Sequence, residues 1–219
     1  MATTSLGATH GVKQRKRINF KSVHKWDAIF KDGTKYRDLN EIFVLQLIGE
    51  FESSMGAEPA HVMDLGCGTG DTLAKFCARG IGVTGIDFST VALQEAGKRL
   101  RACKEKLVLI EADLEHLHSL NMKTPAGTLW LCKLVLAFIK DKTKFLEDVR
   151  GKMNVGDMLF VMTPVLHEEI LYTKEDKPGI ALRLEEADIL MSTIFGDKRM
   201  FSNEYPGERG HIISYLVKK

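Results

Sequence analysis

DLGCGTG, residues 64–70, is the stretch of sequence that decides the fold. A short apolar run, residues 61–63, leads into it, and residues 71–77 leave it with apolar side chains at helical spacing. Glycines at alternate positions let the backbone turn sharply and let a ligand approach main-chain atoms with no Cβ in the way. The stretch therefore predicts a strand, a glycine loop that binds a cofactor, and a helix, in that order.

The spacing of the glycines and a neighbouring charge decide which kind of cofactor fits. A dinucleotide-binding loop has the pattern G-x-G-x-x-G, with the pyrophosphate at the N-terminus of the next helix. Here Gly70 comes one residue too early for that pattern, and Asp71 places a negative charge in the first helical turn. That charge would repel a pyrophosphate, which needs N–H donors at this position. The loop therefore favours a ligand that carries positive charge and no phosphate.

Two further apolar runs each end in an acid. Residues 80–87 end in Asp87, and residues 106–113 end in Asp113. Ligands of open α/β sheets bind at the carboxyl ends of the strands, so we expect Asp64, Asp87 and Asp113 to converge on one site. Each acid taken singly could instead cap the helix that follows it. Three in succession beside a glycine loop favour a shared binding site.

The pattern D-x-G-x-G-x-G, together with the two later acids, resembles the class I S-adenosylmethionine-dependent methyltransferases of the Rossmann-like, small-molecule type. The resemblance covers about residues 38–219. It implies an α/β fold, a three-layer, doubly wound, seven-stranded sheet that is mostly parallel with an antiparallel last strand. It also implies an enzyme that binds S-adenosyl-L-methionine and transfers its methyl group by direct displacement to an oxygen, nitrogen or sulfur nucleophile, without a metal.

The hydrophobic periodicity and the capping residues predict elements in an order that is similar to this family's. Helices are expected over residues 37–53, 71–77, 90–102, 142–153 and 184–195. Strands are expected over residues 61–63, 80–87, 106–113, 128–132, 158–162, 198–205 and 211–217.

The resemblance also assigns residues to the cofactor. Asp64 would lie near the methionine ammonium group, and Asp87 would accept hydrogen bonds from the two ribose hydroxyls. Phe88 would pack on the adenine face, and Asp113 would bind the exocyclic amine with the Leu114 backbone beside it. Phe88 could instead be a residue of the core. The expected cofactor site comprises Asp64, Gly66, Cys67, Gly68, Gly70, Asp87, Phe88, Asp113, Leu114 and Cys132.

Residues on the substrate side are expected on segments that flank this site. Residues 20–37 and 164–183 would serve as lids. The substrate-side candidates are Trp26, Tyr36, His167 and Tyr205. No catalytic base is identified, because Phe138 stands where many small-molecule members of the family carry histidine. His116 and His118 lack a third ligand nearby, so no metal site is predicted.

Missing motifs indicate a small-molecule substrate. Enzymes that methylate amide or adenine amino groups carry an (Asn/Asp)-Pro-Pro-(Tyr/Phe) loop after the fourth strand, whereas residues 132–135 here read CKLV. Residues 1–26 contain lysines and arginines but no acid. We therefore expect a basic arm, residues 1–24, before one methyltransferase domain, residues 25–219. The alternatives are an RNA-directed enzyme that uses this arm and a cofactor-binding partner subunit without catalysis.

Composition and cysteine spacing limit the remaining classes. The chain has 219 residues and 44% hydrophobic content, enough for one domain with a full core. It has no apolar run long enough to span a membrane and no apolar leader at its N-terminus. Its four cysteines have no C-x-x-C spacing, which indicates neither a disulfide framework nor a zinc site. A reducing, cytoplasmic compartment is expected, and the oligomeric state is not indicated.

Overall fold

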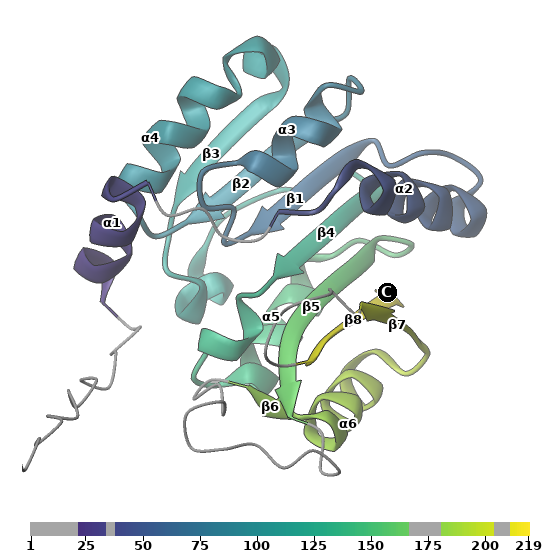
Figure 1. Cartoon of the computed structure of the whole chain (residues 1–219). Helices are drawn as coiled ribbons and strands as arrows, with labels where there is room; N and C mark the ends of the chain where they lie inside the picture. The colour runs from purple at the N-terminus through teal and green to yellow at the C-terminus, as the bar shows by residue number, and fades with distance from the viewer. Residues whose placement is uncertain (1–21, 34–37, 167–180, 204–210) are drawn as a thin grey trace, which may run out of the picture.

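The computed structural model describes residues 22–33, 38–166, 181–203 and 211–219. Its centre is a sheet with the strand order β3-β2-β1-β4-β5-β8-β7, and a short strand β6 pairs with β5. The strands are β1 (His61–Leu65), β2 (Gly82–Asp87), β3 (Leu107–Glu111), β4 (Thr128–Lys133), β5 (Met158–Leu166), β6 (Leu182–Arg183), β7 (Lys198–Asn203) and β8 (His211–Lys218). The first five strands are parallel, and β8 runs antiparallel between β5 and β7 (Figure 1). The predicted mostly parallel sheet with an antiparallel last strand is confirmed, and β6 is an addition to it.

The α-helices follow the predicted order, with one addition. The α-helices are α1 (Val23–Lys31), α2 (Glu41–Met55), α3 (Asp71–Cys77), α4 (Thr90–Arg99), α5 (Lys142–Lys152) and α6 (Leu184–Phe195). The 3₁₀ segments are η1 (Arg101–Lys106), η2 (Leu114–Ser119) and η3 (Leu136–Phe138). Helix α2 begins later than predicted, because the Asn40 side chain accepts a hydrogen bond from the Phe43 N–H and caps the helix there. Helix α1 was not predicted from the sequence.

Two hydrophobic layers cover the two faces of the sheet. One layer joins buried residues of α2, α3 and α4 to one face, and the other joins buried residues of η2, α5 and α6 to the opposite face. Figure 1 shows α2, α3 and α4 together on one side of the strands, and α5 and α6 on the other. This arrangement is the predicted three-layer architecture. Because both faces are covered, a ligand of this sheet must bind at the ends of its strands.

The glycine loop between β1 and α3 is fastened to strand β2. The N–H groups of Gly66 and Cys67 both donate to the carbonyl oxygen of Ile86, at 2.7 and 3.0 Å. A Cβ atom on Gly85 would lie 2.6 Å from the Sγ of Cys67, so only glycine at this position lets the loop pack on β2. The loop therefore sits across the carboxyl ends of β1 and β2.

The cysteines correct one expectation from the sequence. Cys77, the last residue of α3, forms a disulfide with Cys103 in η1, and their Cα atoms are 6.0 Å apart. Cys67 and Cys132 are free and buried. The prediction that cysteine spacing indicates no disulfide is wrong for this pair, because the fold brings together residues that lie 26 positions apart.

Within the described part of the chain, no helix is both long and apolar enough to cross a membrane.

Candidate cofactor and substrate site

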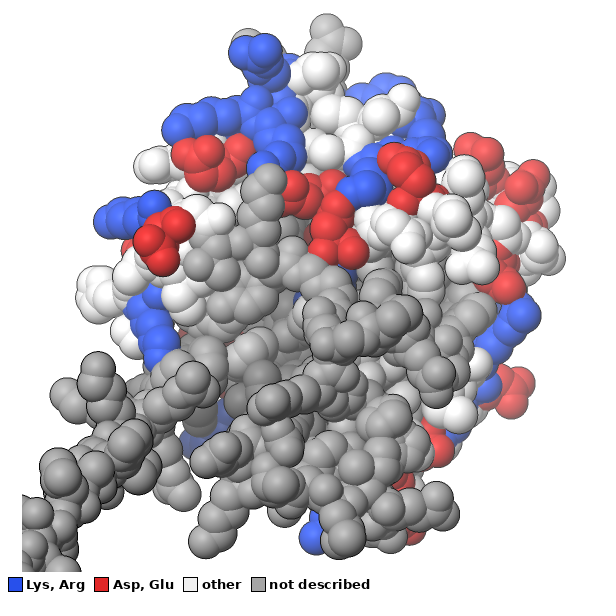
Figure 2. Space-filling view, viewed as in Figure 1, with Lys and Arg blue, Asp and Glu red and all other residues white. Residues whose placement is uncertain are grey.

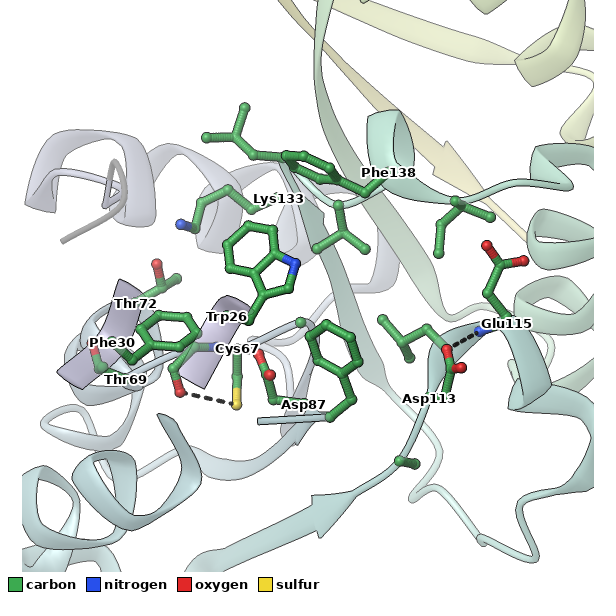
Figure 3. Close-up of a pocket in the computed structure, with 18 of the residues that line it drawn as sticks. Trp26, Phe30, Cys67, Thr69, Thr72, Asp87, Asp113, Glu115, Lys133 and Phe138 are labelled. Atoms are coloured by element: carbon green, nitrogen blue, oxygen red, sulfur yellow. Dashed lines mark hydrogen bonds between the residues drawn. The ribbon is translucent and has the colours of Figure 1, made fainter. Parts of the chain in front are cut away.

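A cavity of about 530 Å³ opens at the carboxyl ends of β1, β2 and β4 and the loop after β3 (Figure 3). Residues of the predicted site that line it are Trp26, Gly66, Cys67, Gly68, Asp87, Phe88, Asp113 and Leu114. Asp64, Gly70 and Cys132 are not among the lining residues. The other predicted substrate-side residues, Tyr36, His167 and Tyr205, lie outside the described residues.

In the glycine loop, backbone atoms without side chains form part of the cavity wall. Gly66 has a φ of 77°, and a Cβ on it would lie 2.3 Å from a methyl group of Val135. Gly68 has a φ of 52°, and its N–H donates to Asp87 Oδ2 at 2.9 Å. Gly70 also has positive φ, but a Cβ there would meet Leu100 and Ala96 of the neighbouring helix segment. Gly66 and Gly68 therefore shape the cavity, whereas Gly70 allows α3 to pack closely on α4.

Asp87 is a buried hydrogen-bond acceptor at the end of β2. Its Oδ1 accepts the Ser89 N–H at 2.9 Å, while Gly68 donates to its other oxygen. Burial raises the pKa of Asp87, and the backbone hydrogen bonds from Ser89, Gly68 and Phe88 oppose that shift. A carboxylate has about four lone-pair positions, so Asp87 can also accept donors from a ligand in the cavity.

Asp64 lies beneath the cavity floor and is 1% exposed. Neither of its carboxylate oxygens has a hydrogen-bond partner among the described residues. Burial raises the pKa of Asp64 to about 7, the charge of Lys133 lowers it, and the charges of Asp87 and Asp38 raise it further. A buried carboxyl group without partners is rare in native structures, and such a group is stabilised in its ionised form by a nearby cation.

Four aromatic side chains surround the mouth of the cavity. The Trp26 indole lies 5.9 Å from the Phe30 ring in a stacked arrangement and 5.3 Å from the Phe138 ring in an edge-on arrangement. It also lies 6.4 Å from the Phe88 ring. Figure 3 shows the indole between the rings of Phe30 and Phe138. The aromatic side chains make this part of the cavity apolar and flat-walled.

Helix α1 carries Trp26 and Phe30, and a polar contact joins it to the start of α4. The Ser89 hydroxyl donates to Asp27 Oδ1 at 2.5 Å, and Ser89 also caps α4 by accepting the Ala92 N–H. Residues four apart share one face of a helix, which is why Trp26 and Phe30 both reach the cavity. The sequence analysis placed Trp26 at the site but missed Phe30, whose spacing from Trp26 was the available signal.

At the opposite end of the cavity, Asp113 both caps a helix and lines the wall. Its Oδ1 accepts the Glu115 N–H at 3.0 Å at the start of η2, and its side chain is 53% exposed. Asp113 therefore caps a helix, which was the alternative interpretation of this acid, and also lines the cavity. His116 Nδ1 lies 3.6 Å from Asp113, and both His116 and His118 are exposed. The described residues contain no group of three or more side chains that could hold a metal ion.

Several lining residues were not assigned to the cofactor or the substrate from the sequence. Asp38 accepts a hydrogen bond from Thr72 Oγ1 at 2.8 Å and forms an ion pair with Lys75. Leu134 has a φ of 61°, a conformation that non-glycine residues rarely adopt and that clusters at functional sites. The remaining ones are Phe30, Thr69, Asp71, Thr72, Ala112, Glu115, His116, Lys133, Val135, Phe138, Ile139 and Lys140. Most of them lie in or next to the loops after β1, β3 and β4, and their residue types do not form a recognisable binding motif.

A family model matches the central part of the chain. Residues 62–154 match a model described as a methyltransferase domain. This match supports the resemblance to the class I S-adenosylmethionine-dependent methyltransferases. The matched residues run from β1 to just after α5 and so include the glycine loop, Asp87, Asp113 and the end of β4. The match supports an enzyme, and S-adenosyl-L-methionine is the cofactor that the resemblance implies.

Solved structures share the fold of this methyltransferase domain. A crystal structure of the plantazolicin methyltransferase BamL with a desmethylPZN analog and S-adenosylhomocysteine gives a TM-score of 0.63 at 13% identity, over 89% of this chain and 88% of that chain. An S-adenosylmethionine-dependent methyltransferase from Clostridium acetobutylicum gives 0.59 at 17% identity, over 89% and 96%. Phosphoethanolamine N-methyltransferase 2 from Haemonchus contortus gives 0.61 at 13% identity, over 80% and 52%. No curated protein sequence matches the chain.

Proposed function

We propose that the chain transfers the methyl group of S-adenosylmethionine to an oxygen, nitrogen or sulfur nucleophile of a small molecule by direct displacement. One observation carries this proposal. The cavity of about 530 Å³ has the glycine loop and Asp87 on its inner wall and the rings of Trp26 and Phe138 at its mouth. Small-molecule sites are concave, mostly apolar and supplied with a few convergent polar groups, as this cavity is.

The residues at the cavity suit this cofactor. Bare main chain at Gly66 and Gly68 leaves room for the amino-acid part, and Asp87 would accept hydrogen bonds from the ribose hydroxyls. Phe88 and Leu114 would contact the adenine, with Asp113 near its amine. Asp64 would act from beneath as an uncompensated negative charge that favours a cationic ligand. Cys67 would line the same cradle, while the buried Cys132 and Gly70 would support it from outside the cavity.

The chain itself would contribute to the reaction by positioning the acceptor and by excluding water from the cavity. When bound, S-adenosylmethionine supplies a methyl group that its positive sulfur already activates. The cavity walls would hold the acceptor in line with that methyl group, and alignment of this kind can remove about 7–11 kcal/mol of a reaction barrier. Helix α1 places Trp26 and Phe30 against the cavity, where they would exclude water.

The surface favours a small acceptor over nucleic acid. Figure 2 shows basic and acidic side chains intermixed over the described part of the visible face. Ion pairs such as Arg99 with Asp71 and Arg79 with Glu41 balance several of these charges locally. Nucleic-acid sites have a clustered positive footprint instead. The basic residues before residue 22 lie outside the described residues.

The domain boundary predicted from the sequence, between residues 24 and 25, falls inside α1, so we also propose that the methyltransferase domain begins at about Val23 and that the residues before it are a separate basic arm. A chain that lacks residues 1–21 should bind S-adenosylhomocysteine as the full chain does, because α1 begins at Val23. A labelled-methyl transfer screen of both chains against metabolites and RNA tests the proposed function. Transfer to a small molecule by both chains supports it, and transfer to RNA by the full chain alone contradicts it.

A further inference from the structure

Asp64 is a buried acid whose two carboxylate oxygens have no hydrogen-bond partner among the residues that the structure describes. It is the last residue but one of β1, and its register partners are Gly85 of β2 and Leu131 of β4. Neither of these neighbours has a side chain that can donate a hydrogen bond. Buried carboxyl groups are normally partnered, so a missing partner needs an explanation.

The charge of Asp64 acts at the wall of the cavity. Burial and then the charges of Asp64 and Asp87 raise the pKa of the Cys67 thiol, and Cys67 lines the cavity. Figure 3 draws Cys67 and Asp87 among the lining side chains. Asp38, whose charge raises the pKa of Asp64, lines the cavity as well. A positive charge at this wall therefore acts on Asp64 from outside the protein core.

The titratable groups that act on Asp64, or on which it acts, come from four places in the fold. They are Lys133 and Cys132 of β4, Asp87 of β2, Cys67 of the glycine loop and Asp38 before α2. Both thiols stay neutral, because burial raises the pKa of each. Burial raises the pKa of Asp64 most, Lys133 lowers it, and the two acids raise it, which gives a value of about 7. Near neutral pH, Asp64 is therefore present in both its protonated and its ionised form.

The methyl donor and the product of the proposed reaction differ by one positive charge. Both molecules carry an ammonium and a carboxylate group, whose charges offset each other, and S-adenosylmethionine also carries a sulfonium group. An opposite charge within about 4–6 Å favours the ionised form of an acid by about tenfold to a thousandfold. A ligand with net positive charge therefore gains more from an ionised Asp64 than a ligand without net charge.

We propose that Asp64 is a specificity-determining residue that makes the site bind the methyl donor more tightly than the demethylated product, and that its ionised form carries this preference. This inference rests on the proposed function. When the methyl group leaves, the electron pair of the broken carbon–sulfur bond stays on the sulfur, which becomes uncharged. Asp64 then lacks the cation that offset its charge, so the product is held less strongly and fresh donor replaces it. Protonation of Asp64 removes the preference.

Binding measurements with the wild type and Asp64→Asn test this proposal. Asparagine keeps nearly the shape of aspartate but does not ionise. Each chain is titrated calorimetrically with S-adenosylmethionine and with S-adenosylhomocysteine, without an acceptor, at pH 8 and at pH 6. The readout is the factor by which the substitution weakens each ligand, and titration of the ligands' own groups affects both chains alike.

At pH 8, Asp64→Asn should weaken S-adenosylmethionine about tenfold or more and S-adenosylhomocysteine by a smaller factor. At pH 6 the wild type is itself mostly protonated at Asp64, so the factor for S-adenosylmethionine should shrink about fivefold or more. Asp197→Asn is the matched control, because Asp197 is exposed and does not line the cavity. It should change the affinity for neither ligand.

Proton release by the wild type tests the same proposal without the Asp64 variant. At pH 6.5, calorimetry in buffers of different ionisation enthalpy should show that S-adenosylmethionine displaces about half a proton or more per chain, and S-adenosylhomocysteine fewer. His116 also lines the cavity and can exchange protons. His116→Gln should therefore release as many protons as the wild type.

Three results overturn the proposal and leave the proposed function in place. An equal factor for both ligands would mean that Asp64 acts on the ammonium group that they share. An equal factor at both pH values would mean that the shape of the side chain matters and its charge does not. Unchanged affinity of the variant for both ligands would exclude Asp64 from binding altogether. If the wild type binds neither ligand, the proposed function fails as well.

Discussion

At the scale of single residues, Asp64 links burial to pH dependence. Burial raises the pKa of Asp64 from 3.8 to about 7 in the folded chain. Below pH 3.8, Asp64 is protonated in both the folded and the unfolded chain. Between pH 3.8 and about pH 7 it stays protonated only in the folded chain. The free energy of unfolding therefore falls as the pH rises through this range, and it stops falling above about pH 7.

The Asp64→Asn variant tests this dependence. Its stability should rise relative to wild type by about 2–3 kcal/mol between about pH 5 and about pH 8, because only the wild type must ionise a buried acid. Urea unfolding of both proteins at the two pH values measures the difference. A difference that is the same at both pH values would contradict the burial of an unpartnered charge.

Gly66 tests the shape of the cofactor loop. A methyl group at this position would meet Val135 in a backbone conformation that favours glycine. We expect Gly66→Ala to lower the free energy of unfolding by roughly 1–3 kcal/mol and to weaken S-adenosylhomocysteine binding. Gly49→Ala is the control, because Gly49 lies within α2 with open space around its Cβ position. That substitution should stabilise the chain by about 0.5–1 kcal/mol. Equal effects of the two substitutions in urea unfolding would count against the loop geometry.

At the scale of elements, α1 is the helix whose position depends most on a few contacts. None of its nine residues is buried, and the contacts that join it to the domain include the hydrogen bond of Ser89 to Asp27. An element with so few buried contacts opens more readily than the core.

Removal of the Asp27 contact should therefore act locally. We expect Asp27→Ala to speed amide hydrogen exchange over α1 by about fivefold or more, the effect of about 1 kcal/mol for a lost hydrogen bond. Exchange in β1 and β4 should stay as in wild type. Asp32→Ala, at the exposed C-terminal end of the same helix, is the control and should change α1 less. Unchanged exchange of α1 in the Asp27 variant would show that the aromatic contacts alone hold the helix.

At the scale of the whole molecule, the predictable features were those with a local signal. The bounds of α3 and α6 match the prediction, because apolar residues at helical spacing mark both helices. The glycine loop and Asp87 were also found, since a parallel sheet places strand ends at one edge. The disulfide between Cys77 and Cys103 was missed, because it depends on contacts between segments far apart in the chain.

The same distinction applies to the cavity. Phe30 belongs to a segment without a motif, and only the packing of α1 shows that it shares a wall with the glycine loop. Cys132 and Gly70 were assigned to the cofactor by resemblance, whereas the structure places Cys132 in the core and Gly70 against α4. Strand order predicts where a site lies, and side-chain packing decides which residues reach it.

The central claim is that S-adenosylmethionine lies across the strand ends with its ribose on Asp87. Calorimetric titration with S-adenosylhomocysteine of the wild type, Asp87→Asn and Asp197→Asn tests it most directly, because Asp197 is exposed and does not line the cavity. We predict that the Asp87 variant binds about tenfold or more weakly, from the loss of about 1.5–3 kcal/mol of charged hydrogen bonding, and that the Asp197 variant binds as the wild type does. Equal affinity of the wild type and the Asp87 variant would contradict this placement of the cofactor.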